Sequence, residues 1–255
     1  MLTGFRYRRS SMRLLLYNIR YAVGGGASMR MPLPGAGYVL GDPNVLPELT
    51  RFIQSVDPDI VGLIEVDTGS IRSRMVNQAE AIANDLGMNT SYETKYGERS
   101  INQMLPIVRK QGNAFLAADR VHGENFHYFD TGIKRLIIEL EMEEFAVFLV
   151  HLSLKYRHRH LQLRRLFDLI DATEKPVIVA GDFNTFWGEN EMYLFMKAAG
   201  LSSANVDREP TYPSRAPRKE LDWVLYQDGI QVTGFEIPQV RYSDHLPLVC
   251  DFEVL

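Results

Sequence analysis

Short apolar runs recur along the whole chain, and most of them end at a polar residue. The run Leu14-Leu15-Leu16-Tyr17 stops at Asn18, and the run 60–64 is followed by Glu65. Apolar runs of about four to eight residues with polar or turn-forming residues at their ends are typical of buried strands. On this basis strands are predicted at 13–19, 60–64, 113–117, 136–141, 146–152, 177–180, 223–226, 232–237 and 246–252.

Segments with helical periodicity lie between several of these runs. Leu163, Leu166, Phe167 and Ile170 fall at positions i, i+3, i+4 and i+7, a spacing that describes one amphipathic helix. Further helices are predicted at 45–56, 77–86 and 192–199. Helices need an apolar surface on which to pack, so sheets covered by helices are the simplest arrangement.

The sequence indicates both antiparallel and parallel neighbours among the predicted strands. The run 136–141 is joined to the run 146–152 by a short stretch that contains Glu143-Glu144, which predicts an antiparallel hairpin. Other runs are apolar throughout, as parallel strands that are covered on both faces tend to be. The chain is therefore expected to form mixed sheets in an α/β fold.

One domain is predicted over 12–255, because no linker, low-complexity stretch or internal repeat divides this segment. Residues 1–11 are predicted to be a disordered extension, with Met1 and Met12 as alternative starts. Long loops are expected at 24–47 and 92–111. Such loops in compact domains are usually functional or mobile. In the second loop Tyr96, Arg99 and Arg109 are available to contact a substrate.

Charge and composition narrow the choice of function. The chain has 255 residues, 45% of them hydrophobic, and a formal charge of −4, so a broad basic surface for duplex nucleic acid is not expected. No apolar run approaches the roughly 18 residues that span a membrane. The single cysteine, Cys250, cannot form an internal disulfide, which fits a reducing, cytoplasmic compartment.

The first candidate for chemistry is Gly181-Asp182-Phe183-Asn184, directly after the predicted strand 177–180. The carboxyl ends of strands are where sites form in open α/β sheets. Asp182 is suited to bind a metal or align a water molecule, and the Asn184 amide to donate to a phosphate oxygen. The alternative is a simple Asx turn after a strand.

Two other strands end in the same way. Glu65 follows the run 60–64, and its carboxylate is the hard oxygen ligand that Mg²⁺ or Mn²⁺ prefers. Asn18 ends the first run. The alternatives are an ordinary charged residue in a loop for Glu65 and a turn former for Asn18.

Ser243-Asp244-His245 precedes the last predicted strand. A histidine is suited to acid or base catalysis near neutral pH, but it needs a carboxylate to fix its tautomer. Asp244 is adjacent in the chain and Asp222 begins another predicted strand, and both remain candidates for that partner. The alternatives are a hydrogen-bonded loop histidine and a charge that flanks a strand.

His151 ends the apolar run 145–150, and its functional interpretation is a phosphate contact or an acid for the leaving group. Its alternative is a hydrogen-bonded histidine at the end of a strand. A basic run follows, formed by Lys155, Arg157, His158, Arg159, His160, Arg164 and Arg165. Such a run is more often a solvated helix face than a binding surface, but its place after His151 makes Lys155 a candidate for substrate binding.

Taken together, these motifs resemble those of the endonuclease/exonuclease/phosphatase superfamily, over roughly 12–255. The resemblance is carried by Tyr17-Asn18-Ile19, Leu63-Ile64-Glu65-Val66, Gly112-Asn113-Ala114-Phe115-Leu116, His151-Leu152, Gly181-Asp182-Phe183-Asn184, Leu221-Asp222-Trp223-Val224 and Ser243-Asp244-His245-Leu246-Pro247. Gly-Asp-x-Asn followed by Ser-Asp-His is the specific part. It implies a four-layer α/β/β/α sandwich, in which two packed mixed sheets are flanked by helices and the site lies where these strand ends converge.

The resemblance also implies a metal site. Glu65 would be the principal ligand of Mg²⁺ or Mn²⁺, assisted by Asn18 and Asp244. Some nucleases of the superfamily carry a second acidic residue two places after the early asparagine, where this chain has Arg20. The number of metal ions is therefore left open, and Arg20 is either turned outward or binds phosphate. Asn113 is a further candidate for substrate binding.

The catalytic roles follow from the same resemblance. Asp182 would align or deprotonate the attacking water, and Asn184 and His151 would hold the phosphate. His245, paired with Asp222, would stabilise the pentacovalent transition state or the leaving oxygen.

These observations predict a divalent-metal-dependent phosphoesterase, with a phosphodiesterase favoured. The expected substrate is a phosphoester in a nucleic acid, a nucleotide or a phospholipid headgroup, with no obligate protein partner. The alternatives are a DNA or RNA nuclease and a catalytically inactive relative that only binds. Metallophosphatases of the calcineurin type are excluded, because they need a later Gly-Asn-His motif that this chain lacks.

Overall fold

Two six-stranded sheets form the centre of the molecule in the computed structural model, which describes residues 11–24, 42–94, 110–118, 121–132, 134, 136–187 and 190–255. The first sheet has the order β11-β12-β1-β2-β4-β3 and the second the order β5-β6-β7-β8-β10-β9. The strands of the first sheet are β1 (Met12–Asn18), β2 (Ile60–Asp67), β3 (Asn89–Thr94), β4 (Gln111–Ala117), β11 (Ile230–Glu236) and β12 (Leu248–Val254). Those of the second are β5 (Gly123–Tyr128), β6 (Leu136–Glu141), β7 (Ala146–His151), β8 (Val177–Asp182), β9 (Leu201–Ser203) and β10 (Asp222–Gln227).

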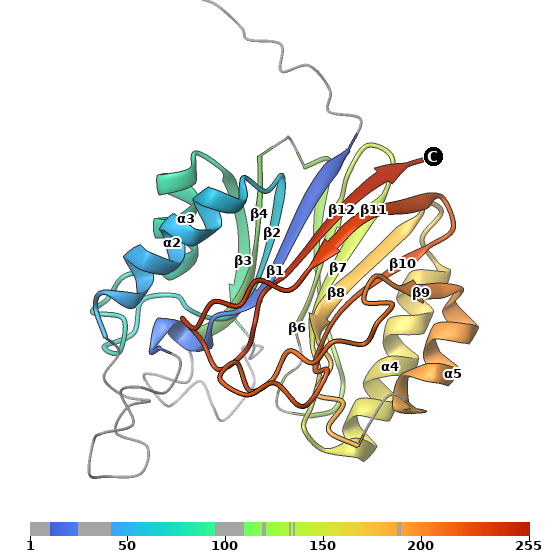
Figure 1. Cartoon of the computed structure of the whole chain (residues 1–255). Helices are drawn as coiled ribbons and strands as arrows, with labels where there is room; N and C mark the ends of the chain where they lie inside the picture. The colour runs from blue at the N-terminus through green and yellow to red at the C-terminus, as the bar shows by residue number, and fades with distance from the viewer. Residues whose placement is uncertain are drawn as a thin grey trace, which may run out of the picture.

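Helices cover the outer face of each sheet, as Figure 1 shows. The described helices are the short 3-10 turn η1 (Arg20–Ala22), α2 (Val45–Val56), α3 (Gln78–Leu86), α4 (Tyr156–Asp171) and α5 (Asn190–Ala199). α2 and α3 lie against the first sheet, and α4 and α5 against the second (Figure 1). The predicted four-layer α/β/β/α sandwich is therefore confirmed.

The alternation of side chains along the central strands explains this layering. In β1, Leu14 and Leu16 belong to the core between the two sheets, whereas Leu15 and Tyr17 belong to the core beneath α2 and α3. Successive side chains of a strand point to opposite faces, so a strand that is apolar at every position is buried on both sides. The continuous apolar runs of the sequence thus mark the central strands of a sandwich.

All nine predicted strands are present, and three further strands were missed. β3 and β5 carry mostly polar or exposed residues, and β9 has only three residues. They lie at or next to the edges of their sheets, where one face is not buried. The predicted loops also need correction, because α2 begins at Val45 and β3 and β4 occupy both ends of the segment 92–111. Residues 1–10, 25–41 and 95–109, which include Tyr96, Arg99 and Arg109, lie outside the described residues.

The topology brings the candidate residues to one end of the sandwich. β1 and β2 are parallel, and so are β7 and β8, so Asn18, Glu65, His151 and Asp182 all lie toward the carboxyl ends of these strands. β12 is antiparallel to β1 and β10 is antiparallel to β8, so the residues that begin β10 and precede β12 lie at the same end. The C-terminus lies at the opposite end (Figure 1).

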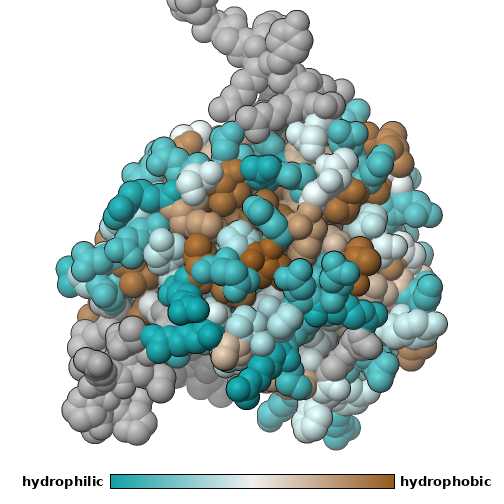
Figure 2. Space-filling model, in the orientation of Figure 1, coloured by the Kyte–Doolittle hydropathy of each residue, from teal (hydrophilic) through white to brown (hydrophobic). Residues whose placement is uncertain are grey.

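The outer surface mixes hydrophilic and hydrophobic residues on the face drawn in Figure 2. Within the described part of the chain, no helix combines the length and the apolar character that crossing a bilayer requires.

Candidate active site

Asp182 stands at the end of β8, which runs parallel to β7 and places Asp182 directly beside His151. A Cβ atom at Gly181 would lie 2.1 Å from the Val150 carbonyl oxygen, so only glycine allows the two strands to approach this closely. Asn184 then adopts a positive φ of 53°. Its backbone N–H donates to Asp182 Oδ1 at 3.0 Å, and its side-chain amide donates to the Leu152 carbonyl at 2.9 Å. Gly-Asp-Phe-Asn is therefore a turn that holds two buried polar side chains rather than a solvated Asx turn.

Asp182 is the centre of a buried polar cluster. Its Oδ2 lies 3.2 Å from His151 Nε2 and accepts a hydrogen bond from Asn18 Nδ2 at 3.1 Å. Burial by itself would raise the pKa of Asp182, but the nearby His151, His245 and Lys134 together hold this pKa well below its ordinary value. Asp182 is thus an ionised acceptor at neutral pH, although it is buried.

Glu65 lies next to this cluster, at a bulge in β2. The register of β2 and β4 shifts between Ile64 and Val66, and Glu65 at this point has a positive φ of 59°. Its backbone N–H donates to Asn113 Oδ1 at 3.4 Å, and its Oε1 lies 3.9 Å from His151 Nε2. Bulges re-aim a side chain where a regular strand would not, and here the bulge brings a carboxylate to the site.

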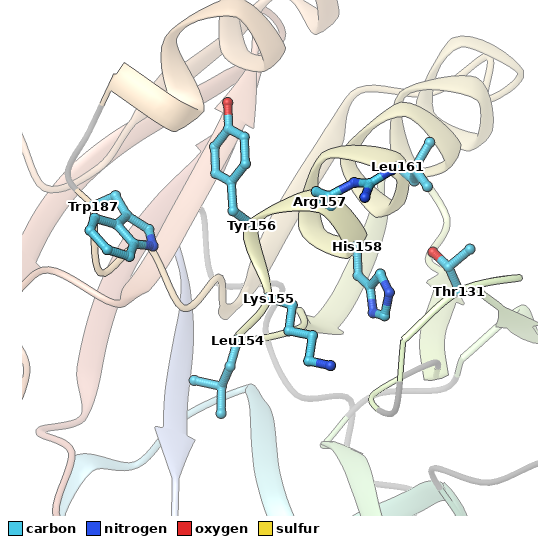
Figure 3. A pocket seen from close by; sticks show the side chains of 8 residues that line it. All are labelled: Thr131, Leu154, Lys155, Tyr156, Arg157, His158, Leu161 and Trp187. Atoms are coloured by element: carbon cyan, nitrogen blue, oxygen red, sulfur yellow. The ribbon is translucent and has the colours of Figure 1, made fainter.

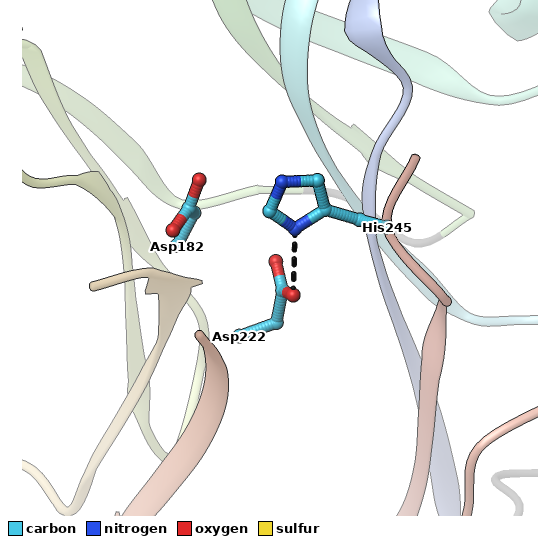
Figure 4. A group of neighbouring side chains, drawn as sticks. All are labelled: Asp182, Asp222 and His245. Atoms are coloured by element: carbon cyan, nitrogen blue, oxygen red, sulfur yellow. Dashed lines mark hydrogen bonds and ion pairs between the residues drawn. The ribbon is translucent and has the colours of Figure 1, made fainter. Parts of the chain in front are cut away.

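His245 is paired with Asp222, so of the two candidate carboxylates it is Asp222 and not Asp244 that binds the imidazole ring in the structure. Nδ1 of His245 lies 2.8 Å from Oδ2 of Asp222, and the Thr211 hydroxyl donates to the same oxygen at 2.6 Å. In Figure 4 the dashed line joins Nδ1 of His245 to Asp222, and the other ring nitrogen, Nε2, is turned toward the side on which Asp182 lies. Burial lowers the pKa of His245, but the carboxylates of Asp222 and Asp182 outweigh it and raise this pKa to about 10.

Asp244, the other candidate partner, faces a different residue. Its Oδ2 lies 3.5 Å from Arg20 Nε, and the Arg20 backbone N–H donates to Asn18 Oδ1 at 3.1 Å. Arg20 is therefore turned toward the last loop of the site. The positive charge of Arg20 offsets the negative charge of Asp244.

Lys134 was missed in the sequence. Its Nζ lies 3.9 Å from Glu65 Oε1 and is also in contact with His151 Nε2. The hairpin predicted between the runs 136–141 and 146–152 could have located Lys134. Because Ile137 pairs with Val150 in the antiparallel register, the residues just before β6 must run beside those that follow His151.

Lys155, in contrast, is exposed at the start of α4, where its backbone N–H donates to Ser153 Oγ at 3.4 Å. Among the described contacts none joins its side chain to the buried cluster. Arg159 departs from the expected solvated helix face, because its guanidinium is buried and binds Glu191 and the carbonyl of Ser153.

The donors present suit a hard divalent cation. Ligand atoms of Asp182, Asp222 and His245 lie within 4.8 Å of one another (Figure 4), but Asp222 already accepts hydrogen bonds from His245 and Thr211. The carboxylate of Glu65 and the side-chain oxygen of Asn18 lie at the same end of the sheets. Carboxylate and amide oxygens are the ligands that Mg²⁺ and Mn²⁺ take.

Comparison with known proteins finds bacterial relatives of this chain. The chain is 35% identical over 94 residues to a UPF0294 protein of Yersinia pseudotuberculosis. The matched residues make up 36% of this chain and 35% of that protein, so the chain spans about a third of the length of that relative. It is 25% identical over 232 residues to the Escherichia coli protein YbhP, which is 82% of this chain and 89% of that protein.

Solved structures share the fold. The human Nocturnin catalytic domain with bound sulfate has a TM-score of 0.71 and 21% identity over 97% of this chain and 95% of that one. An endonuclease/exonuclease/phosphatase protein from Beutenbergia cavernae has a TM-score of 0.72 and 20% identity over 96% of this chain and 72% of that one. The model of the Endonuclease/Exonuclease/phosphatase family matches residues 15–245. The chain therefore belongs to this family.

Proposed function

We propose that this enzyme is a divalent-metal-dependent phosphodiesterase that hydrolyses its substrate by in-line attack of an activated water molecule. The observation that carries the proposal is the convergence of Asp182, His151, Asn18 and Glu65 at one end of the sandwich, next to the His245–Asp222 pair. Phosphoryl transfer needs a positioned nucleophile and compensation of negative charge on both sides of the phosphorus. These residues supply an ionised carboxylate, that of Asp182, and a cationic imidazole, that of His245, at the same end of the sandwich.

Asp182 aligns the attacking water in this proposal. Asn18 and the Asn184 backbone each donate a hydrogen bond to one of its oxygens, so the carboxylate is fixed in orientation. Its lowered pKa keeps it ionised, and an ionised carboxylate accepts a hydrogen bond from water and takes up part of its proton in the transition state.

His245 stabilises the leaving oxygen. Because Nδ1 is held by Asp222 at 2.8 Å, the proton on Nε2 points outward to the site. The raised pKa keeps the ring protonated at neutral pH, so it donates a charged hydrogen bond to the departing oxygen. His151 and Asn184, at the neighbouring ends of β7 and β8, hold the non-bridging oxygens.

The metal would be Mg²⁺ or Mn²⁺, held by Glu65 with Asn18 and Asp244 as the further oxygen ligands. When bound, such an ion offsets the charge that develops on the phosphate oxygens. Arg20, Asn113 and Lys155 are proposed to contact the substrate, and Lys134 adds a positive charge beside Glu65.

The proposed substrate class is a diester of a nucleotide or a phospholipid headgroup, and the proposed location is the cytoplasm. Solved relatives of the same fold include a mannosyl-6-phosphatase from Bacteroides thetaiotaomicron and ANGEL2, described as a 2',3'-cyclic phosphatase and bound to adenosine-2',3'-vanadate. The names of these two proteins refer to a sugar phosphate and to a nucleotide, so the fold itself does not select one ester.

The test is hydrolysis of a bis-aryl phosphodiester by the full chain with Mg²⁺ or Mn²⁺ and with a chelator. Asp182→Asn is expected to lower kcat by ~10²–10⁴, whereas Asp168→Asn on the exposed face of α4 should change nothing. Turnover that persists in the chelator overturns the metal dependence. Failure to hydrolyse the aryl ester and a panel of phospholipids, cyclic nucleotides, single-stranded RNA and plasmid DNA overturns the activity, and cleavage of DNA or RNA alone identifies a nuclease.

A further inference from the structure

A groove of about 1030 Å³ is formed by the start of α4 and by the loop that follows β8. Figure 3 shows Leu154, Tyr156 and Trp187 around one part of this groove, with the side chains of Lys155 and His158 beside them. Leu161, one turn further along α4, also lines it. None of these side chains takes part in the buried cluster around Asp182.

The apolar side chains of this groove are unusually exposed. Trp187 is 79% exposed, Leu154 58%, Tyr156 54% and Leu161 52%. Single exposed apolar residues are normal, but a group of large ones marks an interaction surface. We call these four residues, Trp187, Leu154, Tyr156 and Leu161, the apolar rim.

Basic residues lie beside the apolar rim along α4. The segment 152–167 contains no acidic residue, and Lys155, Arg157, Arg164 and Arg165 in it are exposed. Arg157, Leu161 and Arg164 are spaced at i, i+4 and i+7, so they lie on one face of α4. The chain as a whole carries a charge of −4, so this positive surface is local and suits an anionic partner.

The apolar rim also borders the active site. Leu154 is the third residue after His151, and Trp187 is the third after Asn184. The two loops are tied together at their base, because the Asn184 side chain donates to the Leu152 carbonyl. A partner bound here would lie beside the end of the sandwich at which the strand ends converge.

We propose that the apolar rim and its basic residues dock this protein on an anionic phospholipid surface. Tryptophan and tyrosine favour the interface between water and lipid, and lysine and arginine bind anionic headgroups. Leu154 and Leu161 favour lipid over single-stranded nucleic acid. Leucine gains free energy by entering hydrocarbon but offers no ring on which a base can stack.

Binding is measured by co-sedimentation of the full chain, without metal or turnover, with vesicles of phosphatidylcholine alone and of phosphatidylcholine mixed with phosphatidylglycerol. We expect binding to the mixed vesicles only, weakened by salt. Trp187→Ala should weaken it roughly tenfold, and Arg157→Gln about fivefold, as for one basic residue near a charged surface. Leu255→Ser, at an 81% exposed leucine on the opposite end of the sandwich, is the matched control and should bind as the parent does.

Two outcomes overturn the proposal. One is the absence of binding to mixed vesicles, or binding that Trp187→Ala and Leu255→Ser weaken equally. The other is tight binding of a single-stranded oligonucleotide, lost in Trp187→Ala, without binding to vesicles, which assigns the groove to nucleic acid. Hydrolysis of the soluble aryl diester is measured on the same variants and is expected to be unchanged. Failure of docking is therefore distinguishable from failure of the proposed activity.

Discussion

The ion pair between Asp67 and Arg72 offers the most direct test of how the site is supported. Both side chains are fully buried, and Arg72 Nη2 lies 2.9 Å from Asp67 Oδ2. The guanidinium also lies 3.7 Å from the centre of the Tyr21 ring in η1. Gln78 joins the same segments, because it accepts from the Asp67 backbone N–H and donates to the Tyr21 carbonyl. The pair therefore fastens the strand that carries Glu65 to the turn that carries Arg20.

Arg72→Met keeps most of the side-chain volume but leaves the Asp67 carboxylate buried without its cation. Breaking one half of a buried ion pair costs about 3–5 kcal/mol. The Asp67 carboxylate still accepts hydrogen bonds from the backbone N–H groups of Gly69 and Ser70, so the lower value, about 3 kcal/mol, is expected. This is a large share of the roughly 5–15 kcal/mol that stabilises a domain.

The assay is unfolding in urea, monitored by tryptophan fluorescence. With a urea dependence of about 3 kcal/mol per molar, the midpoint should fall by about 1 M. Arg74→Met, at an exposed arginine two residues further on, is the control and should shift the midpoint very little. Adding Asp67→Asn to Arg72→Met should recover part of the loss, because the charge is then removed as well. Equal midpoints for Arg72→Met and Arg74→Met would refute the reasoning.

Three further outcomes are expected. Gly181→Ala should destabilise the fold by about 1–3 kcal/mol or more, because its Cβ would lie 2.1 Å from the Val150 carbonyl oxygen; an unchanged urea midpoint would contradict this close approach. Asp222→Asn should lower kcat for the aryl diester more than it raises KM, because Asp222 holds His245 at 2.8 Å; an effect confined to KM would remove His245 from the chemistry. Burial raises the pKa of Glu220 to about 7, from an ordinary value of 4.5. The folded state therefore holds the Glu220 proton more tightly than the unfolded state, and the free energy of unfolding falls as pH rises from about 4.5 to 7. Glu220→Gln should raise the urea midpoint at pH 8 relative to the parent but not at pH 4, and a gain of equal size at both pH values would show that the ionisation of Glu220 plays no part.

The central strands and the residues at their ends could be predicted from the sequence alone. Strands such as β1 and β8 are apolar at nearly every position because the sandwich buries both of their faces, and this pattern is local and visible in the chain. Asn18 and Asp182 could be found in the same way, since a polar residue that ends a buried strand stands out. The edge strand β5 was not predicted, because one of its faces is exposed and its residues carry no apolar pattern.

Which side chains meet became visible only in the folded molecule. Asp244 adjoins His245 in sequence, yet Asp222, 23 residues away, is the residue that binds the ring, while Asp244 faces Arg20. Lys134 has no motif of its own and reaches Glu65 through the register of β6 against β7. Hydrophobic periodicity reports whether a position is buried, but it says nothing about the partner across a sheet or between sheets. That choice depends on strand order and register, which contacts between distant segments determine.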